Sequence, residues 1–373
     1  MKISHQFDSG NIHVVNATSP DNIRLQINSD HQADFYQWFH FKLQTDVTPI
    51  QERKEHVLHI INAGKSAYVE GWKDYQAVAS YDRDHWFRVP TTYDGEKLTI
   101  TLTPEYDSVY FAYFSPYSYE RHQDLLHNAQ MHLDCQLQVL GQTLDGRDLS
   151  LLKVGEEGEG KRVIWLTARQ HPGETMAEWF IEGFLDRLLD EDDGVARALL
   201  NKAVFYIVPN MNPDGVALGY WRHNINGKDL NRDWKTFEQA ETQVVRDQLE
   251  TIVANGDRIV FAIDFHSTSK NIFYSMPEDY GLHPADMTAR WLNHLDSQTP
   301  DLKVVIKPGN NPDKGVFKQY IADRFGVHAI TYEMADEFSR QRIKELAHKA
   351  ANSFMDIFLA TDASEFRGGS GRK

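Results

Sequence analysis

The sequence is poor in cysteine, in cationic residues and in long apolar runs. Its single cysteine, Cys135, excludes an intramolecular disulfide framework and a metal site made only of thiolates, so any metal would be held mainly by nitrogen and oxygen. Lys and Arg number 39 against 54 Asp and Glu, a net charge of −15, which argues against a broad surface for nucleic acid or an anionic membrane. No stretch approaches the roughly 18 consecutive apolar residues of a membrane-spanning helix.

The chain is long enough for two moderate hydrophobic cores, since 41% of its 373 residues are hydrophobic. Residues 1–8 hold no apolar segment of signal-peptide length. Because a lone cysteine also suits a reducing compartment, we expect a cytoplasmic protein without a nucleic-acid or membrane partner. The sequence specifies no oligomeric state.

The pattern of apolar residues changes near residue 120. Before it, short alternating or β-branched segments are separated by turn signals, which predicts a smaller antiparallel β-sandwich domain over residues 1–120. After it, strand-like runs alternate with helical periodicities, at 163–168, 175–189, 203–208, 239–254, 259–265, 329–332 and 343–358. This alternation predicts an α/β domain over residues 121–363, with a mixed, largely parallel sheet flanked by helices. The glycine-rich residues 364–373 are expected to form a flexible tail.

A histidine and a glutamate, His171 and Glu174, fall on the turn between the expected strand at 163–168 and the helix that follows it. Residues three positions apart can share one face of an opening helical turn, so this pair can reach a single metal ion. Alone, the pair has a simpler interpretation, in which the histidine starts the helix and the glutamate favours the helix dipole. A third ligand and a base elsewhere in the chain decide between the two.

Two further chemical residues follow strands of the same expected sheet. His266 follows one buried strand and Glu333 follows the last one. Each alone would be interpreted as a satisfied core histidine or a solvated charge, but open α/β sheets bind ligands at this edge. Together with His171 and Glu174 they favour one catalytic Zn²⁺ per chain, held by two histidines and one carboxylate with a position left for water. Glu333 is then suited to accept the proton of that water as general base.

Two arginine-containing segments offer positive charge to a substrate. Arg222 is a candidate to stabilise an oxyanion, although an exposed loop arginine is an equally good interpretation. Asn231 and Arg232 place an amide beside an arginine fork that could bind a carboxylate bidentately, although a surface ion pair is the commoner fate of an arginine.

An ordered set of motifs runs through the second domain, namely His-Pro-Gly-Glu at 171–174, Asn-Pro-Asp-Gly at 212–215, Asn-Arg at 231–232, His-Ser at 266–267 and the late Glu333. In this order they resemble the zinc metallocarboxypeptidases, and in particular their cytosolic carboxypeptidase branch. Residues 135–147 are similar to the family's opening strand and turn, and residues 113–119 to the junction after the N-terminal β domain of the cytosolic branch. The resemblance therefore covers both domains and implies a carboxypeptidase-like catalytic domain.

The resemblance implies a catalytic role for each matching residue. His171, Glu174 and His266 would ligate zinc, with Glu333 as general base and then general acid. Arg222 would polarise the scissile carbonyl.

The resemblance also implies residues that bind the substrate or support the site. Asn231 and Arg232 would grip the C-terminal carboxylate of a peptide or protein, which restricts cleavage to the last residue. Asp229 matches an aspartate that hydrogen-bonds the first histidine and fixes its tautomer, and Ser267 matches a position that lines the cleft.

The chain departs from many relatives at two places. Gly173 stands where they carry an arginine, as expected of the cytosolic branch. The family's mobile tyrosine has no clear counterpart, because an ungapped count from Glu333 reaches Asn311 and Tyr320 is a weak substitute. The same count places Lys318 where the family's side-chain pocket reads the terminal residue, which would favour acidic ends. The alternative for Lys318 is a solvated helix charge.

Three hypotheses of function follow. The favoured one is a zinc exopeptidase that releases a C-terminal amino acid, with acidic ends as one option. The second is a zinc amidase or deacylase acting on N-acyl amino acids or cell-wall peptides, since related folds cleave such bonds with the same ligands. The third is a non-catalytic binder of acidic tails, against which Glu333 argues, because such a protein would be free to lose the base.

Overall fold

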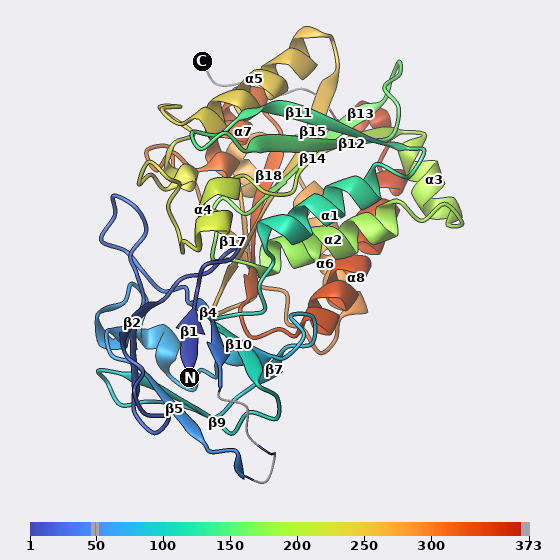
Figure 1. Ribbon diagram of the computed structural model, residues 1–373. Coiled ribbons are helices and arrows are strands. Elements are labelled where there is room, and N and C mark those ends of the chain that lie inside the picture. The colour runs from blue at the N-terminus through green and yellow to red at the C-terminus, as the bar shows by residue number, and fades with distance from the viewer. Residues whose placement is uncertain (46–48, 50–51, 367–373) are drawn as a thin grey trace. The chain divides into compact units, whose positions relative to one another are not determined.

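The chain forms two compact units in the computed structural model, which describes residues 1–45, 49 and 52–366 (Figure 1). Unit 1 comprises Met1–Tyr119 together with Asp214–Gly227, and unit 2 comprises Glu120–Pro213 and the chain from Lys228 onward. Segment 214–227, which the sequence placed inside the second domain, thus makes its contacts in unit 1. Over the part of the chain that is described, no helix has both the length and the apolar character needed to cross a membrane.

Unit 1 is built on two five-stranded sheets. One has the order β1 (Lys2–Ser4), β4 (His40–Gln44), β10 (Ser108–Ala112), β6 (Val78–Ser80), β7 (Phe87–Arg88), and the other has the order β2 (His13–Asn16), β3 (Ile23–Gln26), β5 (His56–Ile60), β9 (Leu98–Leu102), β8 (Thr91–Tyr93). The described pairs are antiparallel except for β3 with β5. In β5 buried residues alternate with half-buried ones, as in a strand that presents one face to a core. The expected smaller antiparallel β domain is confirmed.

Short helical elements complete unit 1. Two 3₁₀ helices lie between β5 and β6, and most of α4 falls in segment 214–227; their bounds are η2 (Ala63–Lys65), η3 (Val69–Trp72) and α4 (Pro213–Leu218). The indole of Trp72 is buried and donates to the carbonyl of Ala63 and the hydroxyl of Ser66, which closes this region onto the core.

Unit 2 contains an eight-stranded mixed sheet. Its order is β11 (Cys135–Gln142), β12 (Asp148–Val154), β14 (Ala203–Val208), β13 (Arg162–Ala168), β15 (Arg258–Thr268), β18 (His328–Ala335), β16 (Ile272–Ser275), β17 (Ile306–Pro308). Four neighbouring strands at its centre run parallel, namely β14, β13, β15 and β18. Every residue of β13 and β14 is buried, as expected of parallel strands covered on both faces. The α/β prediction is confirmed.

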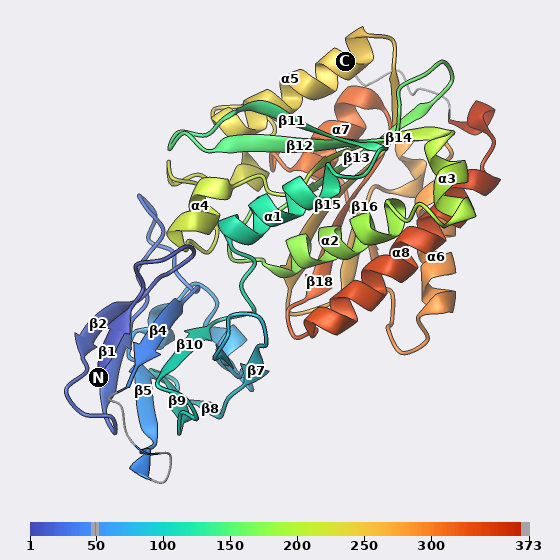
Figure 2. The ribbon, with the colours of Figure 1, turned by 45° about the vertical axis from the view of Figure 1, so that its right-hand side comes forward.

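Helices cover both faces of this sheet (Figures 1 and 2). One face carries α5 (Ala240–Ala254) and α7 (Phe317–Phe325), and the other carries α2 (Met176–Leu188) and α8 (Arg340–Ala360), with α1 (Tyr119–Ala129), α3 (Gly194–Leu200) and α6 (Met287–Gln298) beside them. Further 3₁₀ turns are η4 (Leu230–Arg232), η5 (Glu278–Tyr280) and η6 (Ala363–Glu365). Fully buried side chains such as Trp165 and Phe354 each stabilise the fold by about 1.5–3 kcal/mol.

Two local expectations are wrong. β15 and β18 run past their expected ends, so His266 and Glu333 lie within the strands because the parallel ladder continues through them. The expected flexible tail begins too early, because η6 and the buried Phe366 are ordered parts of unit 2. Residues 367–373 lie outside the described residues.

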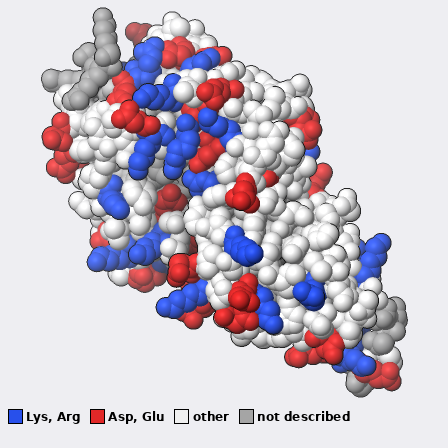
Figure 3. Space-filling view, turned by 90° about the vertical axis from the view of Figure 1, so that its left-hand side faces the viewer, with Lys and Arg blue, Asp and Glu red and all other residues white. Residues whose placement is uncertain are grey.

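Charged side chains of both signs are interspersed over the face shown in Figure 3.

The packing of α2 against α8 depends on Gly183. A Cβ atom at this position would lie 2.9 Å from the Cβ of Ala347 and 3.2 Å from the Cα of Lys344. We predict that Gly183→Ala pushes the helices apart and lowers the free energy of unfolding by about 1–3 kcal/mol, measured by urea denaturation. Gly158→Ala is the control, because its Cβ would meet only the Lys161 side chain, at 3.7 Å or more. Equal stability of the two variants would contradict the close contact.

Candidate metal centre

A residue with an unusual backbone opens the turn between β13 and α2. Arg169 has a φ of 58°, in the left-handed region that side chains other than glycine rarely adopt. Its guanidinium donates to the carbonyl of Pro172 at 2.5 Å and to Oε2 of Glu178 at 3.0 Å. Both side chains are buried, so these contacts fix the loop that carries His171 and Glu174.

The same glutamate ties the loop to a second helix. Oε1 of Glu178 lies 2.6 Å from Nδ1 of His122 in α1, and His122 is also buried. A buried group of three ionisable side chains thus joins α1, the loop and α2. Removal of one member of such a group leaves an uncompensated charge, which costs about 3–5 kcal/mol.

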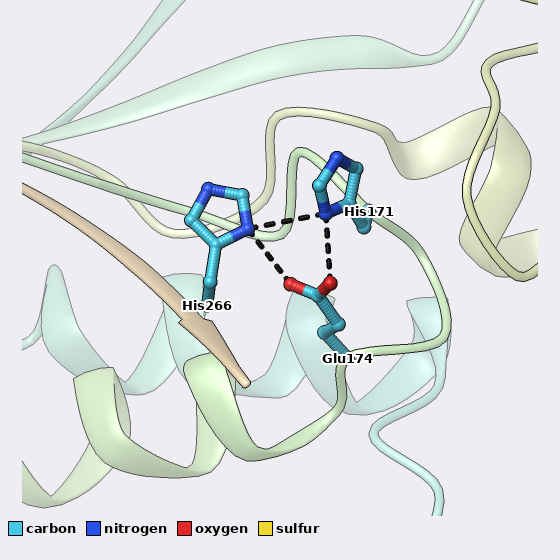
Figure 4. A group of neighbouring side chains, drawn as sticks. All are labelled: His171, Glu174 and His266. Carbon is cyan, nitrogen blue, oxygen red and sulfur yellow. Dashed lines mark hydrogen bonds and ion pairs between the residues drawn. The ribbon is translucent and has the colours of Figure 1, made fainter. Parts of the chain in front are cut away.

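Two imidazoles and one carboxylate converge beside this loop (Figure 4). Oε1 of Glu174 lies 2.7 Å from Nδ1 of His171, and Oε2 lies 2.7 Å from Nδ1 of His266. The two Nδ1 atoms are 3.2 Å apart. Ligand atoms of a tetrahedral zinc ion, each about 2.0–2.1 Å from the metal, would be about 3.3 Å apart, so the spacing of the nitrogens suits such an ion. All three side chains are buried.

The outer nitrogens of both rings face carboxylates. Nε2 of His171 lies 3.0 Å from Oδ1 of Asp229, which is the contact that the resemblance implied for Asp229. Nε2 of His266 lies 2.7 Å from Oδ2 of Asp264, a buried residue. A carboxylate that accepts from Nε2–H leaves the Nδ1 lone pair free to bind a metal, so both aspartates favour the ligating tautomer.

Asp264 was not among the residues singled out from the sequence. It stands two positions before His266 within β15, and side chains two apart on a strand share one face. That spacing was the available signal, but a polar residue inside a buried strand does not by itself indicate a metal site.

The charges of the cluster support one another. Burial alone would raise the pKa of Glu174, but His171 and His266 lower it below its usual value. Burial alone would lower the pKa of His266, but Asp264 and Glu174 raise it well above its usual value. Burial raises the pKa of Asp264, against the opposing effect of His266.

Glu333 lies next to this cluster. It pairs in register with His266 across β15 and β18. Burial, with a further contribution from Glu174, raises its pKa to about 8. Among the described residues, neither Oε2 of Glu333 nor the hydroxyl of Ser267 has a hydrogen-bond partner, although both atoms are buried. These two atoms are available to a ligand or to water.

Asn231 and Arg232 belong to η4, close to the same cluster. The Asn231 amide lies 3.3 Å from Nε2 of His266, and its carbonyl oxygen accepts from the backbone of Phe317. The Arg232 guanidinium donates to the main-chain carbonyl of Asn231 at 2.7 Å. The side-chain oxygen of Asn231 is thus occupied, whereas its NH₂ group faces an imidazole nitrogen that already donates to Asp264. This NH₂ group and Arg232 both remain candidates for binding a carboxylate.

Lys318 is buried at the start of α7 and is 3% exposed, so the solvated-charge interpretation is wrong. Its ammonium group donates to the carbonyls of Ser275 and Gly309 at 2.9 and 2.6 Å. Burial lowers its pKa to about 8. Tyr320, two residues further along α7, packs against Trp234, so the structure gives no support to it as a mobile tyrosine.

Arg222 lies in unit 1. Its guanidinium is 5.9 Å from the ring centre of Phe35 and donates to the hydroxyl of Tyr68 at 3.0 Å. Within unit 2, the other candidate residues gather at β15, β18, η4, α7 and the loop before α2.

The residues present fit a divalent transition metal. Two imidazole nitrogens and one carboxylate are the donors of an open catalytic zinc site, and each histidine has a carboxylate behind it. Glu333 and Ser267 add buried polar atoms without partners at the same place.

Two family models match the chain. Residues 3–114 match the one described as cytosolic carboxypeptidase N-terminal domain, and residues 123–353 match the one described as zinc carboxypeptidase. The chain is 34% identical to a metallo-carboxypeptidase from Pseudomonas aeruginosa, solved in complex with (2-guanidinoethylmercapto)succinic acid. That likeness covers 98% of this chain and 100% of the other, with a TM-score of 0.84.

Two further relatives match the chain over different shares of their own length. An uncharacterized protein of Zymomonas mobilis is 41% identical over 310 residues, which cover 81% of this chain and 78% of that protein. Cytosolic carboxypeptidase 2 of Xenopus tropicalis is 26% identical over 98% of this chain but only 42% of its own length. The chain spans less than half the length of the cytosolic carboxypeptidases it matches.

We predict that Asp264→Asn weakens zinc binding about 10- to 100-fold, because the amide no longer holds the His266 ring in the ligating tautomer. Zinc affinity is measured by competition with a chelator. Asp193→Asn is the control, because Asp193 caps α3 and has no contact with the cluster. An unchanged zinc affinity in Asp264→Asn would show that the tautomer of His266 is set by another group.

Proposed function

The chain belongs to the zinc carboxypeptidase family, and we propose that it is a zinc-dependent metallocarboxypeptidase that hydrolyses the C-terminal peptide bond of peptides or proteins. The observation that carries this proposal is the convergence of His171, Glu174 and His266 beside the half-buried Glu333. A carboxylate next to three candidate metal ligands, with a buried oxygen that has no partner among the described residues, suits a general base.

One Zn²⁺ bound by these three side chains would lower the pKa of a water molecule to roughly 7 and polarise a carbonyl group. Glu333 would accept a proton from the attacking water at Oε2 and pass it to the leaving amine. We assign to Arg222 the stabilisation of the carbonyl oxygen.

The free carboxylate of the substrate's last residue needs a cation. Arg232 is assigned to it, together with the NH₂ group of Asn231, whose side-chain oxygen already accepts from the backbone N–H of Phe317. Ser267, whose backbone N–H donates to Glu174 at 3.3 Å, lines the same place. The ligand of the Pseudomonas relative is a succinic acid derivative, which supports a cleft that accepts carboxylates.

We further propose that Lys318 reads the side chain of the last residue and favours Asp or Glu there. The buried ammonium group meets two carbonyls and, through a weaker contact, the sulfur of Met276, and an acidic side chain would be a stronger partner than this sulfur. A buried cation has lost its hydration and is unfavourable unless it is paired. Lys318 should therefore bind a side chain that ends in a carboxylate in preference to a neutral one.

The zinc amidase hypothesis predicts a different substrate from the same ligands. Hydrolysis of acetylated or succinylated amino acids without hydrolysis of peptides would select it. We place the protein in the cytoplasm, in line with its relatives named cytosolic carboxypeptidases.

We predict that Glu333→Gln lowers kcat about 10²- to 10⁴-fold on a peptide substrate while zinc content is unchanged, because the proton acceptor is lost and the ligands remain. Release of the terminal amino acid and the metal content are measured on the same preparation. Glu337→Gln, an exposed carboxylate on the same segment, is the matched control. Full activity of Glu333→Gln would favour a different base, and inactivity of the unaltered zinc-loaded protein on every peptide would contradict a peptidase.

We predict that Lys318→Ala reduces the preference for acidic over neutral C-terminal residues about tenfold or more, because a charged hydrogen bond is lost. kcat/KM is compared over a peptide series that differs only in the last residue. Lys314→Ala removes an exposed cation from the same segment and should leave the preference unchanged. A preference that survives in Lys318→Ala would refute the pocket assignment.

The preference should also depend on pH. Because burial lowers the pKa of Lys318 to about 8, its ammonium group is charged well below this pH and loses its charge as the pH rises through it. Discrimination in favour of acidic ends should therefore fall between pH 7 and pH 9 in the parent protein only.

A further inference from the structure

Segment Asp214–Gly227 leaves unit 2 and makes its contacts in unit 1. The residues that flank it in the chain stay in unit 2 and contact the metal loop there. Asn212 donates to the carbonyl of Gln170 at 3.2 Å, and Asp229 faces His171. Arg222 thus belongs to a short excursion of the chain whose two ends are held beside the candidate metal centre.

The excursion is fastened to the β domain at several points. The backbone N–H of Ser9 donates to the carbonyl of Ala217 at 3.0 Å, and the Asn11 amide donates to the carbonyl of Gly219 at 2.8 Å. Gly219 has a φ of 72°, and a Cβ atom there would lie 2.8 Å from the carbonyl oxygen of Ser9. Only glycine allows the two backbones to approach so closely.

One carboxylate holds the part of the excursion that contains Arg222. Oδ1 of Asp30 accepts from the backbone N–H of Trp221 at 2.7 Å, and Oδ2 accepts from those of Arg222 and His223 at 2.9 Å each. Nδ1 of His223 lies 3.1 Å from the same Oδ2. Three consecutive amides therefore point at one buried side chain, which is 3% exposed.

Asp30 is itself fixed within the β domain. Its backbone N–H donates to the carbonyl of Phe35 at 2.8 Å, and its carbonyl accepts from Ala33 at 3.2 Å. The ring of Phe35 in turn lies beside the Arg222 guanidinium and the His223 ring. The turn that carries Asp30 therefore holds residues 222 and 223 in two ways. Asp30 binds their backbone amides, and Phe35 contacts their side chains.

Hydrogen bonds from backbone amides to a carboxylate are charge-assisted and stronger than those between neutral groups. Their geometric effect is specific here, because three N–H vectors converging on one group leave the backbone of residues 221–223 little freedom. A group used in catalysis loses about 100-fold in rate when it is displaced by about 1 Å, so such an anchor matters to the reaction.

We infer that Asp30 is a positioning residue for the reaction, through which the β domain fixes the backbone of Arg222. The inference rests on the carbonyl-stabilising role proposed for Arg222. It gives the β domain a part in catalysis although the domain contributes none of the described metal ligands.

A double-mutant cycle tests the inference. Asp30→Asn keeps the size of the side chain but turns an NH₂ group toward amides that need an acceptor. Asp30→Asn should lower kcat about 10- to 100-fold with unchanged zinc content, and should change kcat less than about twofold when Arg222 is already Ala. Asn62→Ala, which removes side-chain hydrogen bonds to Ile27 in the same unit, is the control for general loss of stability and should leave kcat unchanged.

The kcat values of Asp30→Asn, Arg222→Ala and the double variant distinguish a failure of the inference from a failure of the proposed function. A loss of kcat in Arg222→Ala with none in Asp30→Asn would overturn the inference and leave the proposed function intact. Equal losses from Asp30→Asn in both backgrounds would also overturn it, because Asp30 would then act by another route. An unchanged kcat in Arg222→Ala would contradict the role of Arg222 and, with it, the inference.

A second variant covers the case in which Asp30→Asn does not fold. Gly219→Ala strains the same excursion at an independent anchor and should lower kcat in the parent background but not in Arg222→Ala. Hydrogen–deuterium exchange should show faster exchange at the amides of 221–223 in Asp30→Asn, and at 214–223 in Gly219→Ala. Unchanged exchange and unchanged kcat in the folded variants would overturn the inference.

Discussion

The parallel pairing of β13, β15 and β18 is the constraint on which the candidate metal centre depends. It sets Ala168 opposite Phe265 and His266 opposite Glu333, so the loop after β13 starts beside the strand that carries the second histidine. Side chains alternate along a strand, and a register shift of one residue would turn His266 and Asp264 to the other face. Because both faces of these strands are covered, such a shift would also disrupt the close packing of the side chains on both faces, and the hydrophobic core thereby protects the geometry of the site.

Charge is concentrated in this part of the core, and each buried charge is compensated in a different way. Glu174 faces two imidazoles, and Glu178 faces Arg169 and His122. Two of the carboxylates are less well satisfied, since Oε2 of Glu333 and Oδ1 of Asp264 are buried without a partner among the described residues. A cation that binds only the folded chain would stabilise it by mass action, so the group that supports catalysis would also support the fold.

The two units divide the work in a way that their boundaries along the chain do not suggest. Unit 2 contains the candidate metal ligands, the proposed general base and the candidates for substrate binding, whereas the arginine proposed for the carbonyl oxygen lies in unit 1. Within unit 1 this arginine is held by local hydrogen bonds to a single carboxylate and by a glycine that permits close backbone contact. The match of residues 3–114 to a domain that accompanies cytosolic carboxypeptidases is consistent with a β domain that serves the same reaction.

The sequence by itself determined the chemistry and the class of fold. The zinc carboxypeptidase resemblance is confirmed, as are the β domain and the mixed sheet, because apolar periodicity and short motifs are local properties that a chain displays before it folds. Only the tertiary structure decided which polar residues support that chemistry. In the sequence, Asp264 is an ordinary residue of a buried strand and Lys318 resembles a surface charge, whereas in the fold Asp264 contacts His266 and Lys318 is buried. Asp30 lies 192 positions from Arg222, whose backbone amide it binds. These contacts arise from long-range packing and register, which no local pattern specifies.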